Sequence, residues 1–367
     1  MTQQILQRES HSRTLGRVPR DKTHVVVSSA PAPVRTDRSG RVSGVTGWFA
    51  RLGRNFAPQD WYITAYFTIM ALAVIFGTGP GREHSLSLVG TDVAFLVVGL
   101  ALTRGEVLKP GSFLSALLYR FTVWLTVFCS YFQLRHILPA VSERAVDGDL
   151  LAFDLRVFHF EPSIAWDHFV TPVTTEWFAF FYFGYFFLLA AHVLTVMMAS
   201  KSAFRLAHFA LGIFLVFCTG HLVYMLVPGY GPYRYLAGTF NHELTGGPFW
   251  HAVQASVSAG GAQKDIFPSL HTGCPTYFAL YSYRHRKVVP YKYTWLVTSF
   301  CATQIIIATM FLRWHYLIDI FAGLTLAFTT QFVGQAVADW EQVKRRRLGL
   351  SPVWMAPPLM TASDRTP

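Results

Sequence analysis

The stretch 313–323, RWHYLIDIFAG, opens the last long apolar run of the chain. It places His315 and Asp319 four residues apart, so on a helix the two side chains share a face. The carboxylate can then accept the imidazole N–H and fix its tautomer, which leaves the second ring nitrogen free as a base or nucleophile. A purely structural role also remains open, in which Asp319 caps the start of the helix and His315 only packs against its neighbours. Ionisable groups on membrane helices are functional by default, which favours chemistry.

The composition around this stretch is that of a membrane protein. Of 367 residues, 52% are hydrophobic and 14% are charged, whereas an ordinary soluble domain has about 25% charged residues. The apolar residues are gathered into blocks. The net charge of +11 is concentrated in the N-terminal tail, short loops and the cluster 344–347. This is the layout of cytoplasmic flanks beside an anionic leaflet rather than of a nucleic-acid surface.

The apolar blocks predict an all-α integral membrane fold with about eight transmembrane helices. Each block has roughly the 17–25 residues that cross a bilayer. The predicted spans are 61–77, 86–102, 113–138, 177–199, 206–227, 268–283, 293–312 and 316–337. Between spans three and four, the segment 139–175 mixes acids, His and Trp with apolar residues. It is too polar to span, so we expect interfacial or re-entrant helices there.

The domain organisation follows from these blocks. We expect a basic, disordered cytoplasmic tail over 1–55, a membrane catalytic domain over 56–340 and a second basic cytoplasmic tail over 341–367. An apolar signal-peptide core is not found in the first tail, and its Arg- and Ser-rich composition leaves an organellar transit peptide as a weaker alternative. The loops that share a side with the termini carry more Lys and Arg than the opposite loops. The positive-inside rule therefore places both termini in the cytoplasm and the loops before His271 and His315 on the extracytoplasmic face.

The cysteines do not predict a metal site or disulfides. Cys129, Cys218, Cys274 and Cys301 lie in or beside apolar blocks without a CxxC spacing. The histidines outside the motifs also lack a ligand spacing such as HExxH. We therefore expect neither metal nor cofactor.

Three separate pieces of chain meet on the extracytoplasmic face in this topology. PGYGPYRYL (228–236) brings Arg234, and KDIFPSLHTG (264–273) brings Lys264, Ser269 and His271. The third piece brings His315 and Asp319, together with Arg313. Two histidines, a carboxylate and several basic residues suit phosphoryl transfer. The basic residues and Ser269 would bind substrate by spreading the negative charge of the phosphate.

The pairing of FPSLHTG (267–273) with HYLIDIFAG (315–323) resembles the type 2 phosphatidic acid phosphatase superfamily. Within it, residues 115–337 are most similar to the branch of inositol phosphorylceramide synthase, an inositolphosphotransferase, and its bacterial relatives. Leu270, the pair His315-Tyr316 and the segment AFDLRVFHFEP (152–162) favour this branch. The resemblance implies that His315 is the nucleophile that becomes phosphohistidine, that Asp319 is its partner and that His271 is the general acid.

The chain departs from the phosphatase branch at its basic residues. The Lys-x6-Arg-Pro motif is missing, and Arg234 is a partial substitute at a comparable place. The usual Arg six residues before the nucleophilic His is replaced by Thr309, while Arg313 lies two residues before it.

The expected function is therefore that of a membrane lipid phosphatase or phosphotransferase. Its partners would be the membrane and a lipid phosphate ester or phosphodiester, and the resemblance favours transfer to a ceramide-like or other lipid hydroxyl. Two alternatives remain open. One is a non-catalytic binder or translocator of lipid or polyprenyl phosphates, and the other is a metal-dependent membrane hydrolase that uses the same histidines.

Overall fold

The structure is a computed structural model that describes residues 45–200, 202–260 and 264–354, and within these ranges every regular element is a helix. The described residues all belong to one compact unit. The long helices are α2 (Pro58–Ile75), α3 (Arg82–Arg104), α4 (Phe113–Val141), α7 (Pro172–Ala199), α8 (Ala203–Leu226), α11 (Leu270–Arg284), α12 (Tyr291–Phe311) and α13 (Leu317–Arg347). The predicted all-α class is confirmed.

Six of these helices are long and apolar enough to cross a membrane, namely α3, α4, α7, α8, α12 and α13. Among the described residues the other two predicted spans, 61–77 and 268–283, coincide with α2 and α11. α11 has 15 residues, fewer than the roughly 17–25 that a spanning helix needs. α2 begins with the polar turn Pro58-Gln59-Asp60, which lowers its mean hydropathy. Six candidate spans are therefore established, and the predicted count of eight is not.

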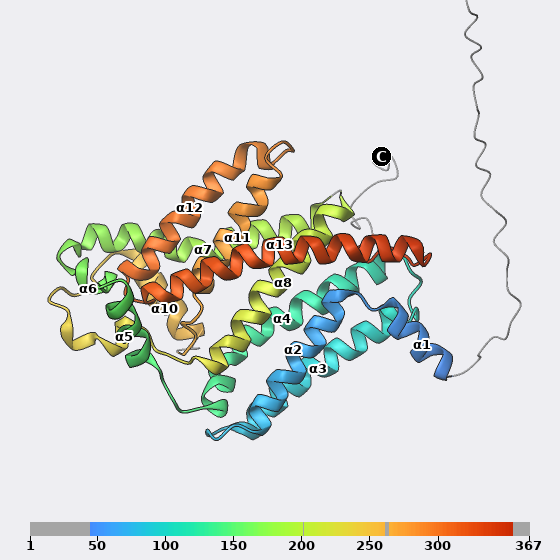
Figure 1. Ribbon diagram of the computed structural model, residues 1–367, viewed down its shortest axis with the longest axis horizontal. Coiled ribbons are helices and arrows are strands. Elements are labelled where there is room, and N and C mark those ends of the chain that lie inside the picture. Colours follow the sequence, from blue (N-terminus) through green and yellow to red (C-terminus); the bar gives the residue numbers. More distant parts are fainter. Residues whose placement is uncertain (1–44, 201, 261–263, 355–367) are drawn as a thin grey trace, which may run out of the picture. The chain divides into compact units, whose positions relative to one another are not determined.

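The packing places α11 at the centre of the C-terminal half. It contacts α12, α13, α8 and α7, and α13 also packs along α8 (Figure 1). Gly323 lets α13 approach the start of α11 closely, because a Cβ added at this position would collide with the carbonyl oxygen of Ser269. The glycine of the second motif thus lets α13 lie directly against the start of α11. In the N-terminal half, α3 packs on α4 and α2, and α2 contacts α8.

Short helices fill the connections on the side where α11 and α13 begin. Between α4 and α7 they are α5 (Asp147–Val157), α6 (Pro162–Ala165) and η1 (Asp167–Phe169). Between α8 and α11 they are α9 (Pro232–Tyr235), η2 (Ala237–Thr239) and α10 (Pro248–Gly260). The predicted interfacial segment 139–175 is thus partly helical, although α4 runs on to Val141 and α7 already begins at Pro172.

The predicted tails differ from the structure at their inner ends. Residues 1–44 and 355–367 lie outside the described residues. The last part of the predicted disordered tail, Val45–Asn55, is the helix α1. At the other end α13 continues to Arg347, past the predicted boundary at 340. The basic residues 344–347 therefore form the last turn of α13.

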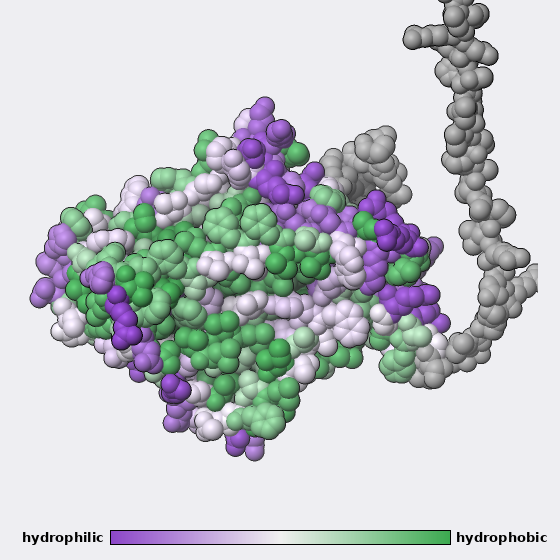
Figure 2. All heavy atoms as spheres, viewed as in Figure 1, coloured by the Kyte–Doolittle hydropathy of each residue, from purple (hydrophilic) through white to green (hydrophobic). Residues whose placement is uncertain are grey.

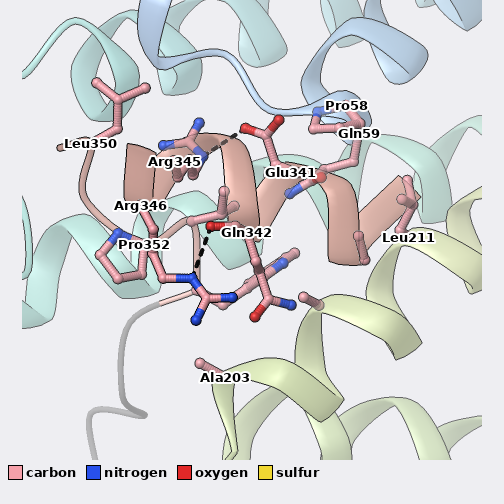
Figure 3. A pocket seen from close by; sticks show the side chains of 14 residues that line it. Pro58, Gln59, Ala203, Leu211, Glu341, Gln342, Arg345, Arg346, Leu350 and Pro352 are labelled. Atoms are coloured by element: carbon pink, nitrogen blue, oxygen red, sulfur yellow. Dashed lines mark hydrogen bonds and ion pairs between the residues drawn. The ribbon is translucent and has the colours of Figure 1, made fainter. Parts of the chain in front are cut away.

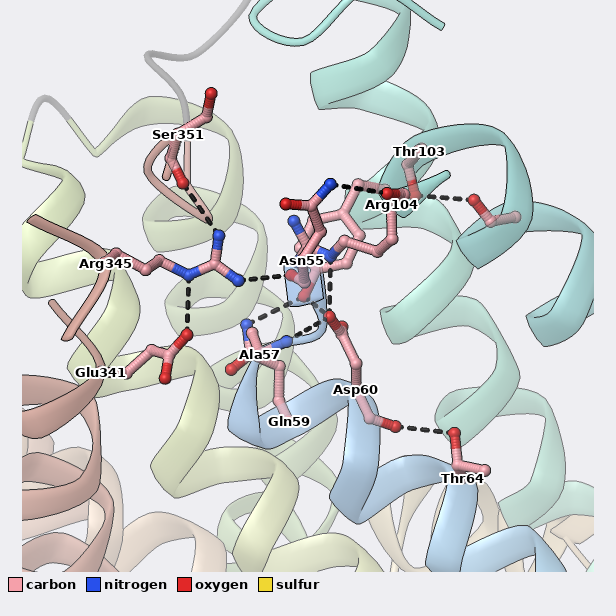
Figure 4. A network of polar contacts seen from close by, with 12 residues as sticks. Asn55, Ala57, Gln59, Asp60, Thr64, Thr103, Arg104, Glu341, Arg345 and Ser351 are labelled. Carbon is pink, nitrogen blue, oxygen red and sulfur yellow. Dashed lines mark hydrogen bonds and ion pairs between the residues drawn. The ribbon is translucent and has the colours of Figure 1, made fainter. Parts of the chain in front are cut away.

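Polar residues gather at the helix ends in Figure 2, around the α11–α12 turn and the C-terminal end of α13, while apolar residues cover the helices between them. At the end where α13 stops, a buried polar network joins elements from both termini (Figure 4). Asp60 Oδ2 accepts from Arg104 Nε at 2.7 Å and from the Ala57 N–H at 2.8 Å. Asn55 donates to the Arg104 carbonyl at 2.9 Å and accepts at its own carbonyl from Arg345. These bonds join α2 to α3, and they join the end of α1 to both α3 and α13.

Candidate active site

His315 and Asp319 lie at the start of α13, where the sequence predicted them. His315 Nδ1 is 3.3 Å from Asp319 Oδ2, and the same oxygen accepts the backbone N–H of Tyr316 at 2.9 Å. The carboxylate therefore caps the helix and holds the imidazole at the same time. His315 also has a hydrogen bond with the backbone of Ile266, and burial lowers its pKa to about 3. Burial thus favours the neutral imidazole, the form that a nucleophile requires.

His271 lies in the first turn of α11 and faces His315, with 6.2 Å between the ring centroids. Two tyrosines of α7 enclose it: the Tyr182 ring stacks on it at 4.4 Å and Tyr185 lies at 4.3 Å. Its Nε2 is buried and lacks a hydrogen-bond partner among the described residues. The ring is thus fixed by packing, and one nitrogen remains available to a ligand.

Ser269 links the two motifs through a backbone hydrogen bond, and its side chain does not reach the cavity. Its Oγ accepts the Thr272 N–H at 3.2 Å, and its own N–H donates to the Asp319 carbonyl oxygen at 3.0 Å. It is fully buried and does not line the cavity that contains the histidines. The serine therefore caps α11 and fixes it against α13.

The three basic candidates are separated by the structure. Arg234, in α9, lines the cavity and lies over the Tyr230 ring at 4.0 Å. Lys264 points its Nζ at three carbonyl oxygens after α4, those of Ser142, Glu143 and Arg144, at 2.8–3.1 Å. Arg234 is therefore the basic candidate that shares the cavity with both histidines, whereas Lys264 holds the end of α4.

Arg313 is engaged with η1 and the loop that follows η2. Its Nη2 donates to Asp167 Oδ1 at 2.8 Å and to the His242 carbonyl at 2.6 Å. Burial raises the pKa of Asp167, but the hydrogen bonds from His242 and Asn241 and the Arg313 charge outweigh it and hold that pKa below its usual value. Arg313 has φ +68, a conformation rare for a non-glycine residue. This ion pair anchors the turn that presents His315.

Two aspartates that sequence reasoning did not assign hold the loops of the site. Asp154 of α5 accepts the backbone N–H groups of Leu317 and Ile318 at 2.7 and 3.0 Å. Asp147, also in α5, accepts the N–H of Gly231 at 2.8 Å and the Tyr316 hydroxyl at 3.2 Å. The only sequence signal for these two aspartates was the cluster of acidic residues in 147–161, within an otherwise apolar chain.

The cavity that contains the histidines has a volume of about 510 Å³, within the range of small-molecule sites. Besides His271, His315 and Arg234 it is lined by aromatic residues, by polar residues of α10 and by Asp265. Tyr131 is hydrogen-bonded to the Asp265 carboxyl, and burial raises the pKa of Asp265 to about 7. Gly231 lets the loop before α9 pack against the Trp314 backbone beside this cavity. Its φ of +84 suits glycine, and a Cβ added there would collide with the Trp314 carbonyl oxygen.

Other potential sites are unlike this one. Over the described ranges, no group of three or more His, Cys, Asp or Glu is placed to hold a metal ion. A groove of about 240 Å³ lies at the far end of α13, between the starts of α2 and α8 and the segment after α13 (Figure 3). From Asp319 to Arg345 the helix axis is roughly 40 Å long at 1.5 Å per residue. The groove is thus remote from the histidines.

The comparisons with known proteins agree with this geometry. A family model described as the PAP2 superfamily matches residues 149–333, just over half of the chain, and this range contains all seven site candidates. The searches of curated proteins and of solved structures gave no match. With the matched range, the paired motifs and the facing histidines together, the chain belongs to the PAP2 superfamily.

Proposed function

We propose that this protein is a membrane phosphotransferase or phosphatase that acts on a lipid phosphate ester or phosphodiester through a covalent phosphohistidine, without a metal. One observation carries the proposal. His271 and His315 line the same cavity and face each other, and of these two histidines it is His315 that contacts a carboxylate, that of Asp319. Neutral His315 can attack phosphorus, while His271 donates a proton to the leaving oxygen and later accepts one from the attacking hydroxyl.

The first step joins the substrate to His315. A ring nitrogen of His315 attacks phosphorus, the N–P bond forms and the bond from phosphorus to the leaving alcohol oxygen breaks. The His271 ring, which is protonated beside the bound phosphate anion, gives its proton to that oxygen. Asp319 stabilises the positive charge that develops on the His315 ring, and Arg234 binds the non-bridging phosphate oxygens.

The second step releases the phosphoryl group. A hydroxyl attacks phosphorus, neutral His271 takes the hydroxyl proton and the N–P bond breaks, which restores both histidines. Water as acceptor gives hydrolysis, and a lipid hydroxyl gives transfer of the phosphorylated group. The resemblance to the inositol phosphorylceramide synthase branch favours a ceramide-like or other lipid hydroxyl.

We infer the membrane topology from the same elements. α2 and α11 would join the six candidate spans to give eight, with α5 and α6 at the interface and both termini in the cytoplasm. The basic side chains that would then face the anionic leaflet include Arg205, those of 284–292 and the cluster 344–347. The catalytic cavity would open on the extracytoplasmic face.

The second candidate function is non-catalytic binding or translocation of lipid or polyprenyl phosphates. It would use the cavity and Arg234 but would not require the Asp319 contact to His315. His271 and His315 share one cavity and Asp319 lies against His315 from behind, an arrangement that favours the enzyme.

The test is phosphate release from a panel of lipid phosphates in detergent with EDTA, with parallel reactions that contain ceramide. The parent is compared with His315→Ala and His271→Ala. Release that is lost in both variants supports a phosphatase, and headgroup transfer without free phosphate supports a transferase. Equal behaviour of parent and variants refutes the catalytic proposal, and activity that disappears in EDTA refutes the metal-free mechanism.

A further inference from the structure

A second, narrower cavity adjoins the catalytic one. It has a volume of about 100 Å³ and lies among α4, α7, α8 and the start of α11. Four residues line both cavities: Tyr131, Phe186, Asp265 and His271. Because the ring of a catalytic candidate is a wall of both, the narrow cavity leads directly to the reaction centre. We call it the aromatic slot.

Beyond the junction, the walls of the aromatic slot carry no charged side chain. α4 contributes Trp124, Val127 and Phe128, α7 contributes Leu189, and α8 contributes Phe217. Burial of hydrocarbon against such surfaces is favourable, by about 0.8 kcal/mol for each methylene taken out of water. A polar headgroup would find few hydrogen-bond partners here. The lining therefore selects an apolar ligand.

The aromatic slot reaches the surface of the protein between α4 and α7, which share α8 as a neighbour but otherwise pack on different helices. α4 packs on α3, α8 and α2, whereas α7 packs on α12, α10 and α11. At its rim Phe128 and Phe132 are 41% and 45% exposed although both are large and apolar, as expected for side chains that face lipid. From Tyr131 to Trp124 the slot follows α4 for about 10 Å, a third of the roughly 30 Å hydrocarbon core of a bilayer.

We propose that the aromatic slot binds one hydrocarbon chain of the lipid whose phosphate reacts at His315. This inference rests on the proposed function and adds a chain-binding subsite to it. The chain enters between α4 and α7, and its polar end comes to lie where the slot meets the catalytic cavity, beside His271. The slot is narrow, so a second chain of the same lipid stays in the bilayer. Chain length is thereby a determinant of specificity, alongside the headgroup.

The first experiment compares substrates of different chain length. Leu189→Trp fills the slot, and Leu194→Trp is its matched control, since Leu194 is on the same helix, is 58% exposed and does not line the slot. We expect Leu189→Trp to lower kcat/KM for a long-chain phosphate monoester by about tenfold, equivalent to about 1.4 kcal/mol, and to leave that of a short-chain, water-soluble monoester within about twofold. Leu194→Trp should change neither. An equal loss for both substrates, or none, overturns the proposal.

A second variant keeps the proposal testable if Leu189→Trp does not fold. Phe128→Ala removes an aromatic wall without overpacking, and Phe121→Ala is the control on the same helix, at a side chain that is 49% exposed and outside the slot. We expect a several-fold lower kcat/KM for the long-chain substrate alone, and only in Phe128→Ala. The same effect in Phe121→Ala would contradict a specific slot.

A binding measurement separates failure of this inference from failure of the proposed function. Alkyl phosphonates of increasing chain length are not hydrolysed, so their binding to the purified protein can be measured whether or not it turns over lipid phosphates. The parent should bind the long-chain phosphonate more tightly than the short one, and Leu189→Trp should remove most of that difference. Affinity that does not depend on chain length in the parent refutes the slot, even if the enzyme is active.

Discussion

The carboxylate of Asp154 accepts the backbone N–H of Leu317 at 2.7 Å, although the two residues are 163 positions apart. Through this bond α5 holds the helix that carries Asp319 and orients His315. We expect Asp154→Ala to lower kcat by about tenfold, because loss of a helix cap costs about 1 kcal/mol and loosens the start of α13. Steady-state kinetics would show this, and Asp149→Ala, at an exposed position of α5, is the control. Equal activity of both variants would mean that α5 does not position the site.

Asp319→Asn tests the role of the carboxylate at constant size. An amide can cap the helix but cannot balance the charge on the His315 ring, so we expect kcat to fall by on the order of 10²- to 10⁴-fold, the range for acid–base groups. Circular dichroism and the elution volume in detergent should match those of the parent. Near-parent activity would show that Asp319 only caps α13, the purely structural role.

The two arginines near the site should respond differently. Arg234 lines the catalytic cavity, and a charge-assisted hydrogen bond to phosphate contributes about 1.5–3 kcal/mol, so Arg234→Ala should raise KM by roughly 10- to 100-fold. Arg313→Ala breaks the buried pair with Asp167 and should mainly lower thermal stability. Kinetics and melting curves of both variants, beside the exposed control Arg156→Ala, decide this. The reverse pattern would identify Arg313 as the phosphate ligand.

The helices and the histidine motifs could be predicted from the sequence because their signals are local. Apolar blocks located every long helix, yet α7 begins five residues before the predicted span, since Thr171 caps it and Pro172 occupies its first turn. The contacts of Lys264 and Asp154 could not be predicted. Each binds backbone groups more than a hundred positions away, and backbone groups leave no trace in the side-chain sequence.

Asp265 should set part of the pH profile. Burial raises its pKa to about 7, so the carboxyl is neutral in mild acid and becomes an anion above pH 7. A negative charge that lines the cavity repels a phosphate anion, and kcat/KM should therefore fall as pH rises from 7 to 9. Asp265→Asn should flatten that decline, because the amide stays neutral. Profiles of parent and variant that superimpose would assign the decline to other groups of the cavity, such as His271.

The buried network at the far end of α13 should matter for stability and leave the chemistry unaffected. Asp60 accepts Arg104 Nε at 2.7 Å and the Tyr119 hydroxyl at 2.7 Å, and it is fully buried. Asp60→Ala leaves the Arg104 charge buried without its carboxylate, which typically costs about 3–5 kcal/mol. We expect the apparent Tm in detergent to fall by on the order of 10 °C, with kcat near that of the parent below the transition. Arg51→Ala, at an exposed position of α1, is the control. A loss of kcat in Asp60→Ala that exceeds the unfolded fraction would instead show that this end of the bundle is coupled to the active site.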